Sequence, residues 1–110
     1  MIKIIATLLT FFAFNVSHAK VNVGIILGFT GPIETLTPGM SAGAELAFNE
    51  AADSGKLLNG QGINIIKVDS TCVDSAAATS AAESLISQGV TAIMGADCSG
   101  VTGAVLSNVA

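Results

Sequence analysis

Three short apolar runs, separated from one another by helical patterns, limit the fold of this chain more than any other feature. The runs that we expect to form strands are residues 21–27, 63–68 and 90–95. The segments with helical features are residues 39–54, 75–87 and 101–110. Apolar runs bounded by Gly and polar residues are typical of buried strands, and their alternation with helices predicts parallel pairing through right-handed crossovers. We therefore predict an α/β fold, a β-α-β-α-β-α parallel sheet with flanking helices.

Local signals support the helices. We expect Thr37 to be the N-cap of the first helix, with Pro38 at its first position, and Asp74 to cap the second. Gly55 and Gly89 are expected to end these two helices. The predicted apolar face of the first helix comprises Met40, Ala44, Ala47 and Ala51. The predicted apolar stripe of the second comprises Ala78, Ala82, Leu85 and Ile86.

Two Gly-containing turns follow the first and third predicted strands. In the usual strand order of such sheets, the first strand lies between the second and the third. The switch point then lies beyond the carboxyl ends of the first and third strands, where segments 28–37 and 95–102 meet. Ligands of open α/β sheets bind at such switch points, so we place the candidate site there.

The first 19 residues have the order of a secretory signal peptide. Lys3 precedes the apolar run 4–14, and Ser17-His18-Ala19 supplies small residues for cleavage after Ala19. The run is shorter than the roughly 20 residues that a spanning helix needs. A buried N-terminal helix is the alternative, but the run has no amphipathic face. We expect an exported protein.

The charge balance after residue 19 excludes several functions. Three lysines, no arginine and no histidine remain against eight carboxylates, a formal charge of −5. Nucleic-acid binding requires a basic surface, which is missing. His-dependent catalysis and His-ligated metal sites are also excluded within this chain, and we expect no metal and no cofactor.

The two cysteines favour a disulfide because the chain carries an export signal. Cys72 follows the second predicted strand and Cys98 the third, so both lie at the binding edge of the sheet. Strands two positions apart are separated by about 9.6 Å, whereas bridged Cα atoms lie at about 4.4–6.8 Å. The loops would have to lean together over the first strand. Two free thiols or a redox pair are alternatives, disfavoured because neither cysteine belongs to a C-x-x-C motif.

Ser99 is the leading candidate for a binding residue. A serine at the start of a helix is most often an N-cap, whose hydroxyl accepts from the helix's own N–H groups. Its second role would be to receive a ligand carboxylate together with the N–H groups of residues 100–102. The two roles are compatible. Asp97 could take an ammonium group, although an acid in an exposed turn is more often solvated.

Two other uses of this turn are disfavoured. For a phosphate site, segment 95–102 lacks the lysine of a P-loop, and Gly24, Gly28 and Gly31 do not have the G-x-G-x-x-G spacing. For a nucleophilic serine, the segment lacks G-x-S-x-G, and no His after residue 19 could activate it.

The ordered set of motifs resembles the type I periplasmic solute-binding proteins, in particular the leucine/isoleucine/valine-binding receptors of ABC importers. The motifs are Lys20-Val21-Asn22-Val23-Gly24, Thr30-Gly31-Pro32, Gly43-Ala44-Glu45-Leu46-Ala47, the turn 69–72 and the segment 95–102. The resemblance implies two α/β lobes, joined by a hinge, that close on an amino acid. It also implies a bridge between Cys72 and Cys98.

The resemblance implies a set of ligand-binding residues. Ser99 would hold the ligand carboxylate, and Thr35 and Leu36 would help to form the side-chain pocket. The full expected set is Thr35, Leu36, Cys98, Ser99, Gly100, Val101 and Thr102. The family's other ligand contacts, including the acid that pairs with the ammonium group, would lie beyond Ala110.

We therefore expect residues 20–110 to be the N-terminal part of a longer, non-catalytic receptor, since the last helix reaches Ala110 without a C-terminal signal. It would bind a branched-chain or similar small amino acid in the periplasm and deliver it to ABC permease subunits. The alternatives are a receptor for amides or urea, a sensor lobe, a fragment of an exported α/β enzyme, and a remnant without function.

Overall fold

The computed structural model describes residues 20–110, so the predicted signal peptide, residues 1–19, lies outside the described residues. The strands are β1 (Val21–Leu27), β2 (Ile63–Asp69) and β3 (Ala92–Gly95). The helices are α1 (Thr37–Asp53), the short 3-10 helix η1 (Leu58–Gly60), α2 (Ser75–Ser87) and α3 (Ser99–Val109). The predicted alternation of strand and helix is confirmed.

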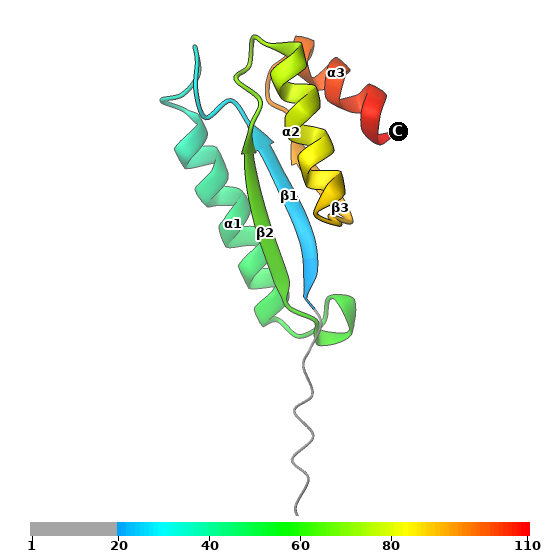
Figure 1. The fold of residues 1–110 in the computed structure, drawn as a ribbon. Coiled ribbons are helices and arrows are strands. Elements are labelled where there is room, and N and C mark those ends of the chain that lie inside the picture. Colours follow the sequence, from blue (N-terminus) through cyan, green and yellow to red (C-terminus); the bar gives the residue numbers. More distant parts are fainter. Residues whose placement is uncertain (1–19) are drawn as a thin grey trace, which may run out of the picture.

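The three strands form one parallel sheet in the order β2-β1-β3. On one side of β1, Val21 pairs with Ile63 and Leu27 with Asp69; on the other, Ile26 pairs with Gly95. The predicted position of the first strand between the other two is therefore confirmed. All three strands point the same way, so the loops that follow them meet at one end of the sheet, the upper end in Figure 1.

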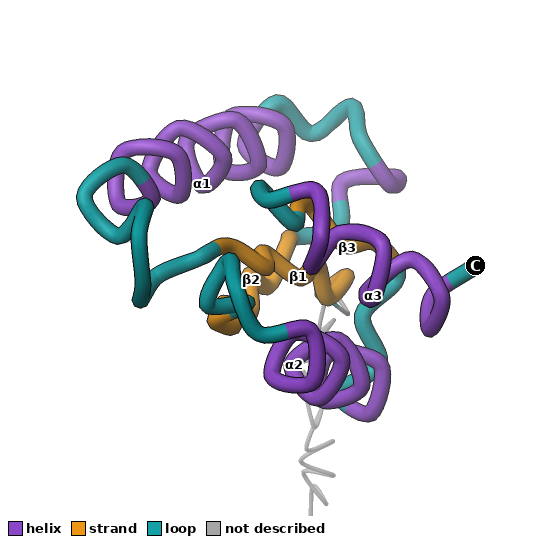
Figure 2. Tube along the Cα trace, turned by 90° about the horizontal axis from the view of Figure 1, so that it is seen from above, coloured by secondary structure: helices purple, strands orange, loops and turns teal. Residues whose placement is uncertain are grey.

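Helices cover both faces of the sheet. Figure 2 shows α1 on one side and α2 on the other. α2 and α3 pack together over the second face in one buried cluster: Ile26, Ala78, Ala82, Leu85, Val101 and Val105. Alternate residues of β1 face the other side, where Ile25 is fully buried. Three members of the stripe predicted for α2 are buried, whereas Ile86 is exposed.

The start of α1 differs from the prediction. Leu36 occupies the N-cap position with helical φ and ψ of −93° and −35°, and Thr37 is already helical. The Thr37 hydroxyl donates to the carbonyl oxygen of Glu34 (3.3 Å) and is fully buried. Because Thr37 lies inside the helix and Leu36 holds the N-cap position, the prediction that Thr37 is the N-cap is wrong.

The face that α1 turns inward also differs. Met40, on the predicted apolar face, is 44% exposed, whereas Ser41 is only 3% exposed. Ser41 is satisfied there because its hydroxyl donates to Glu45 Oε1 (2.8 Å), which also pairs with Lys67 Nζ on β2 (2.9 Å). The hydrogen bond from Lys67 holds the pKa of Glu45 below its usual value. The inward face of this helix is therefore mixed: the buried Ser41 and its polar partner Glu45 lie beside the half-buried Ala44, Phe48 and Ala51.

The other ends of the helices and strands lie within two residues of the predicted ones. Asp74 caps α2 as predicted, accepting from the N–H groups of Ala76 (2.9 Å) and Ala77 (3.0 Å). Gly55 and Gly89 follow the ends of α1 and α2. β3 starts at Ala92 and not at residue 90. Within residues 20–110, no helix combines the length and apolar character needed to cross a membrane.

Candidate functional site

Three loops meet at the carboxyl end of the sheet: the β1–α1 loop (residues 28–36), the β2–α2 loop (residues 70–74) and the β3–α3 loop (residues 96–98). This is the switch point that the alternating pattern predicts. The candidate ligand-binding residues lie on the first and third loops and on the first turn of α3.

The disulfide joins the β2–α2 loop to the β3–α3 loop. Cys72 and Cys98 are bridged, with their Cα atoms 5.2 Å apart. The backbone solves the distance problem: the Ser70 N–H donates to the Leu27 carbonyl (2.8 Å), and Thr71 and Cys72 then adopt left-handed φ angles of 59° and 70°. These turns carry Cys72 over the end of β1.

Gly28 makes room for this crossing. A Cβ atom at Gly28 would lie 3.1 Å from the Cys72 Cβ and 3.2 Å from Ile33 Cγ1, tighter than ordinary van der Waals contact. Gly28 is therefore needed so that Cys72 can lie close to the backbone at the end of β1. The spacing of the glycines in the sequence does not show this role.

Asp69, interpreted above only as part of a turn, binds two loops. Its carboxylate accepts from the Thr30 N–H (3.3 Å), the Thr30 hydroxyl and the Thr71 N–H (2.8 Å). Burial raises the pKa of this carboxyl, but the hydrogen bonds from Thr30 and from backbone N–H groups outweigh burial and hold the pKa below its usual value. Asp69 therefore stays ionised and ties the β1–α1 loop to the β2–α2 loop.

The lowered pKa gives a testable pH dependence. A carboxyl whose folded pKa is depressed contributes stability above its unfolded pKa of about 3.9, and this contribution is lost as the pH falls through the folded value. We expect Asp69→Asn to lower the free energy of unfolding at pH 7 by about 1 kcal/mol, allowing for solvent screening. The deficit should shrink below about pH 4. Urea denaturation between pH 7 and pH 2 measures it; a constant deficit would contradict the assignment.

Asp97 is partly buried and bonds to a backbone group far from it in the sequence. Both of its carboxylate oxygens accept from the Gly28 N–H, at 3.2 and 2.9 Å. The two residues are 69 positions apart in the chain, so no local signal could have shown the contact. Asp97 ties the β3–α3 loop to the β1–α1 loop.

Ser99 is the first residue of α3 and not its N-cap. Cys98 holds the N-cap position, with extended φ and ψ of −118° and 132° and no capping hydrogen bond from a side chain. The prediction that Ser99 caps the helix is therefore wrong, since a helical residue cannot direct its hydroxyl at its own first turn in that way. The exposed Ser99 makes no side-chain hydrogen bond to any other described residue.

The first turn of α3 has backbone N–H groups that are not bonded within the helix. The Thr102 N–H is the first to bond to a preceding carbonyl, that of Cys98 (2.9 Å). The N–H groups of Ser99, Gly100 and Val101 have no intrahelical acceptor, and such groups favour an anion. Val101 as a residue is 1% exposed and belongs to the core, so the exposed N–H groups of this turn are those of Ser99 and Gly100.

The other predicted residues play different parts. The Thr102 hydroxyl donates to the Cys98 carbonyl (2.8 Å), a hydrogen bond within the first turn of the helix. Thr35 and Leu36 lie at the entrance to α1, where Leu36 is 63% exposed. Within residues 20–110, no hydrogen bond links these two residues to the first turn of α3. The structure therefore groups residues 98–102 and leaves Thr35 and Leu36 on a separate loop.

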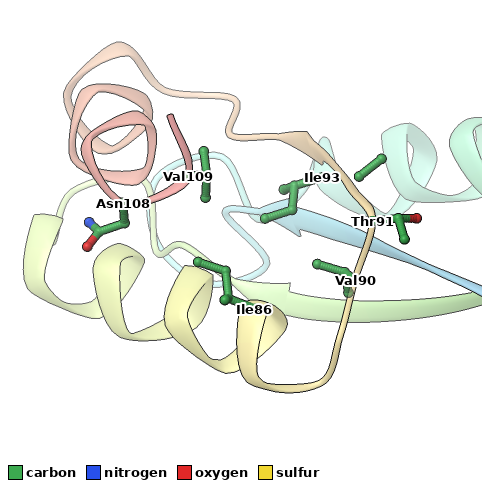
Figure 3. Close-up of a pocket in the computed structure, with 7 residues that line it drawn as sticks. Ile86, Val90, Thr91, Ile93, Asn108 and Val109 are labelled. Atoms are coloured by element: carbon green, nitrogen blue, oxygen red, sulfur yellow. The ribbon is translucent and has the colours of Figure 1, made fainter.

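One hollow in the described part of the chain lies away from this edge. It has a volume of about 390 Å³ and lies at the free side of β3, near the C-terminal ends of α2 and α3 (Figure 3). Ile86, Ile93 and Val109 line it together with Asn108. It contains none of the predicted ligand-binding residues.

Among the described residues, no group of three His, Cys, Asp or Glu side chains could hold a metal ion.

A three-stranded parallel sheet with helices on both faces and a switch point between its first and third strands is typical of open α/β domains. A sequence model described as periplasmic binding protein matches residues 20–110. The chain therefore belongs to the periplasmic binding protein family.

Solved structures support the fold. LivJ from Streptococcus pneumoniae str. Canada MDR_19A, a branched-chain amino acid transporter substrate-binding protein in complex with isoleucine, aligns with a TM-score of 0.72 and 26% identity over 82% of this chain and 26% of its own. An extracellular ligand-binding receptor from Verminephrobacter eiseniae ef01-2 aligns with a TM-score of 0.71 and 19% identity, over 82% of this chain and 25% of its own. The chain thus spans about a quarter of each. No curated protein matches it.

Proposed function

We propose that this chain supplies part of the first lobe of a periplasmic receptor that binds a branched-chain or similar small amino acid and delivers it to the permease subunits of an ABC importer. The observation that carries the proposal is the first turn of α3, where Ser99 and Gly100 are exposed and their N–H groups, like the Ser99 hydroxyl, have no partner within the helix. LivJ, which aligns with 82% of this chain, was solved with isoleucine.

In this proposal the ligand carboxylate binds at the first turn of α3. The helix N-terminus carries partial positive charge, and an anion is stabilised there. The β1–α1 loop, with Thr35 and the exposed Leu36, contributes an apolar wall for the ligand side chain. A second lobe would close over the ligand, supply the acid for its ammonium group and exclude water. No bond is made or broken, so the receptor is not an enzyme.

The test is binding of L-isoleucine to the complete exported protein, measured by isothermal titration calorimetry, in the wild type and in Ser99→Ala. A hydrogen bond to a charged group is worth about 1.5–3 kcal/mol, so we expect the Kd to rise about 10- to 100-fold. Ser107→Ala is the matched control, because Ser107 lies in the last turns of the same helix and donates to the Gly103 carbonyl (3.0 Å). Its Kd should stay within about twofold of the wild type.

A panel of leucine, valine, acetamide and urea separates the proposal from its alternatives. Tightest binding of acetamide or urea would identify an amide receptor. If the wild type bound none of these compounds, amino-acid capture would be refuted. Equal losses of affinity in Ser99→Ala and Ser107→Ala would place the ligand carboxylate elsewhere.

A further inference from the structure

The three loops at the switch point are each tied to the other two. The disulfide joins the β2–α2 loop to the β3–α3 loop. Asp69 joins the β1–α1 loop to the β2–α2 loop through Thr30 and Thr71, and Asp97 joins the β1–α1 loop to the β3–α3 loop through Gly28. The three loops follow three neighbouring strands at the same end of the sheet (Figure 1). We call these three ties the loop triangle.

One side of the loop triangle joins the two segments that the proposed site needs. Asp97 lies two positions before Ser99, and Gly28 begins the loop that ends at Leu36. Among the described residues, the contact between Asp97 and Gly28 is the only hydrogen-bonded link between residues 28–36 and residues 96–102. The disulfide cannot replace it, because neither cysteine belongs to the β1–α1 loop.

The geometry of the bond between Gly28 and Asp97 is suited to holding the two loops at a fixed distance. The Gly28 N–H lies within reach of both carboxylate oxygens; Gly28 is buried and Asp97 is partly buried. A charge-assisted hydrogen bond is shorter and stronger than one between neutral groups. The segment that bears Ser99 is therefore held from two directions, by the bond of Asp97 to the end of β1 and by the bridge of Cys98 to the β2–α2 loop.

We propose that Asp97 is a positioning residue of the ligand site: its carboxylate sets the distance between the first turn of α3 and the β1–α1 loop, and so places Ser99 relative to Leu36. This inference rests on the proposed function, because it concerns how the same site is assembled. In this role the Asp97 carboxylate acts through its bond to the Gly28 N–H and not by contact with the ligand.

The test compares Asp97→Ala with a matched control, Asp74→Ala, in the complete exported protein. Asp74 is also an aspartate of these loops whose carboxylate accepts from backbone N–H groups, but it caps α2 and does not bond to the β1–α1 loop. Both variants should lower the Tm. Only Asp97→Ala should raise the Kd for L-isoleucine, by about tenfold, and speed hydrogen exchange of the Gly28 amide by about tenfold.

The variant Asp97→Asn distinguishes a role in positioning the loops from a general loss of stability. It keeps one acceptor oxygen for Gly28, so we expect its Kd for isoleucine and its Gly28 exchange rate to lie between the wild type and Asp97→Ala. If Asp97→Ala does not fold, Asp97→Asn carries the test, and wild-type values for both measurements would overturn the inference. Equal losses of isoleucine affinity in Asp97→Ala and Asp74→Ala would also overturn it.

Failure of the proposed function gives a different pattern. If the wild type does not bind isoleucine, the proposed ligand class is wrong, and exchange of the Gly28 amide alone decides whether Asp97 fixes the loops. Faster exchange in Asp97→Ala but not in Asp74→Ala would retain the positioning role. Unchanged exchange in both variants would exclude it.

Discussion

Gly95→Ala is expected to lower the free energy of unfolding by about 2–6 kcal/mol, the largest loss that we expect for a Gly→Ala change within residues 20–110. Gly95 ends β3 opposite Ile26, the buried centre of the sheet, and has a φ of 117°. A Cβ atom there would overlap the Ile26 carbonyl oxygen and lie 2.9 Å from its carbonyl carbon. These are backbone atoms of a strand paired on both sides, so neither can move aside.

Urea denaturation of Gly95→Ala, compared with Gly103→Ala, measures this effect. Gly103 lies inside α3, where an added Cβ atom would meet nothing within 4 Å. Alanine there should stabilise the protein by about 0.5–1 kcal/mol, because glycine is a poor helix residue. Wild-type stability in Gly95→Ala would mean that β3 does not end against β1 as described.

Removing the disulfide is expected to cost about 3.5 kcal/mol of unfolding free energy, the second large effect. The bridge joins residues 26 positions apart, and the chain-entropy relation gives that magnitude for this length. The best variant is Cys72→Ala combined with Cys98→Ala, which leaves no free thiol. Because the bridge spans the end of β1, its loss also releases the β3–α3 loop that leads to Ser99.

A reducing agent provides the internal control. The wild type should lose a similar amount of stability in a phosphine reductant, whereas the double variant should not respond to it. The readout is the urea midpoint with and without reductant. A double variant as stable as the oxidised wild type would show that the loops hold together without the bridge.

Tertiary contacts that join distant residues account for what the sequence patterns missed. Asp97 and Gly28 are 69 positions apart, and Asp69 and Thr30 are 39 apart. An aspartate in a turn has the same local appearance whether water or a distant N–H group satisfies it. The inward turn of Ser41 on α1 was missed for a related reason, since it depends on Glu45 meeting Lys67 on another element. The site residues Thr35, Leu36 and Ser99 remain predictions about ligand contact.

The sequence by itself determined the alternation of three strands and three helices, the strand order, and helix ends such as the Asp74 cap and Gly89. The elements and their ends follow from periodicity and capping chemistry, which act over a few neighbouring residues. The strand order follows from the order that is usual for parallel sheets with right-handed crossovers. Only the tertiary structure decided that Asp69 and Asp97 bind the β1–α1 loop. It also decided that Gly28 lies against Cys72 and Gly95 against Ile26, where a Cβ atom would not fit. These depend on which surfaces meet after packing, where a single hydrogen bond or a missing Cβ atom decides the fit.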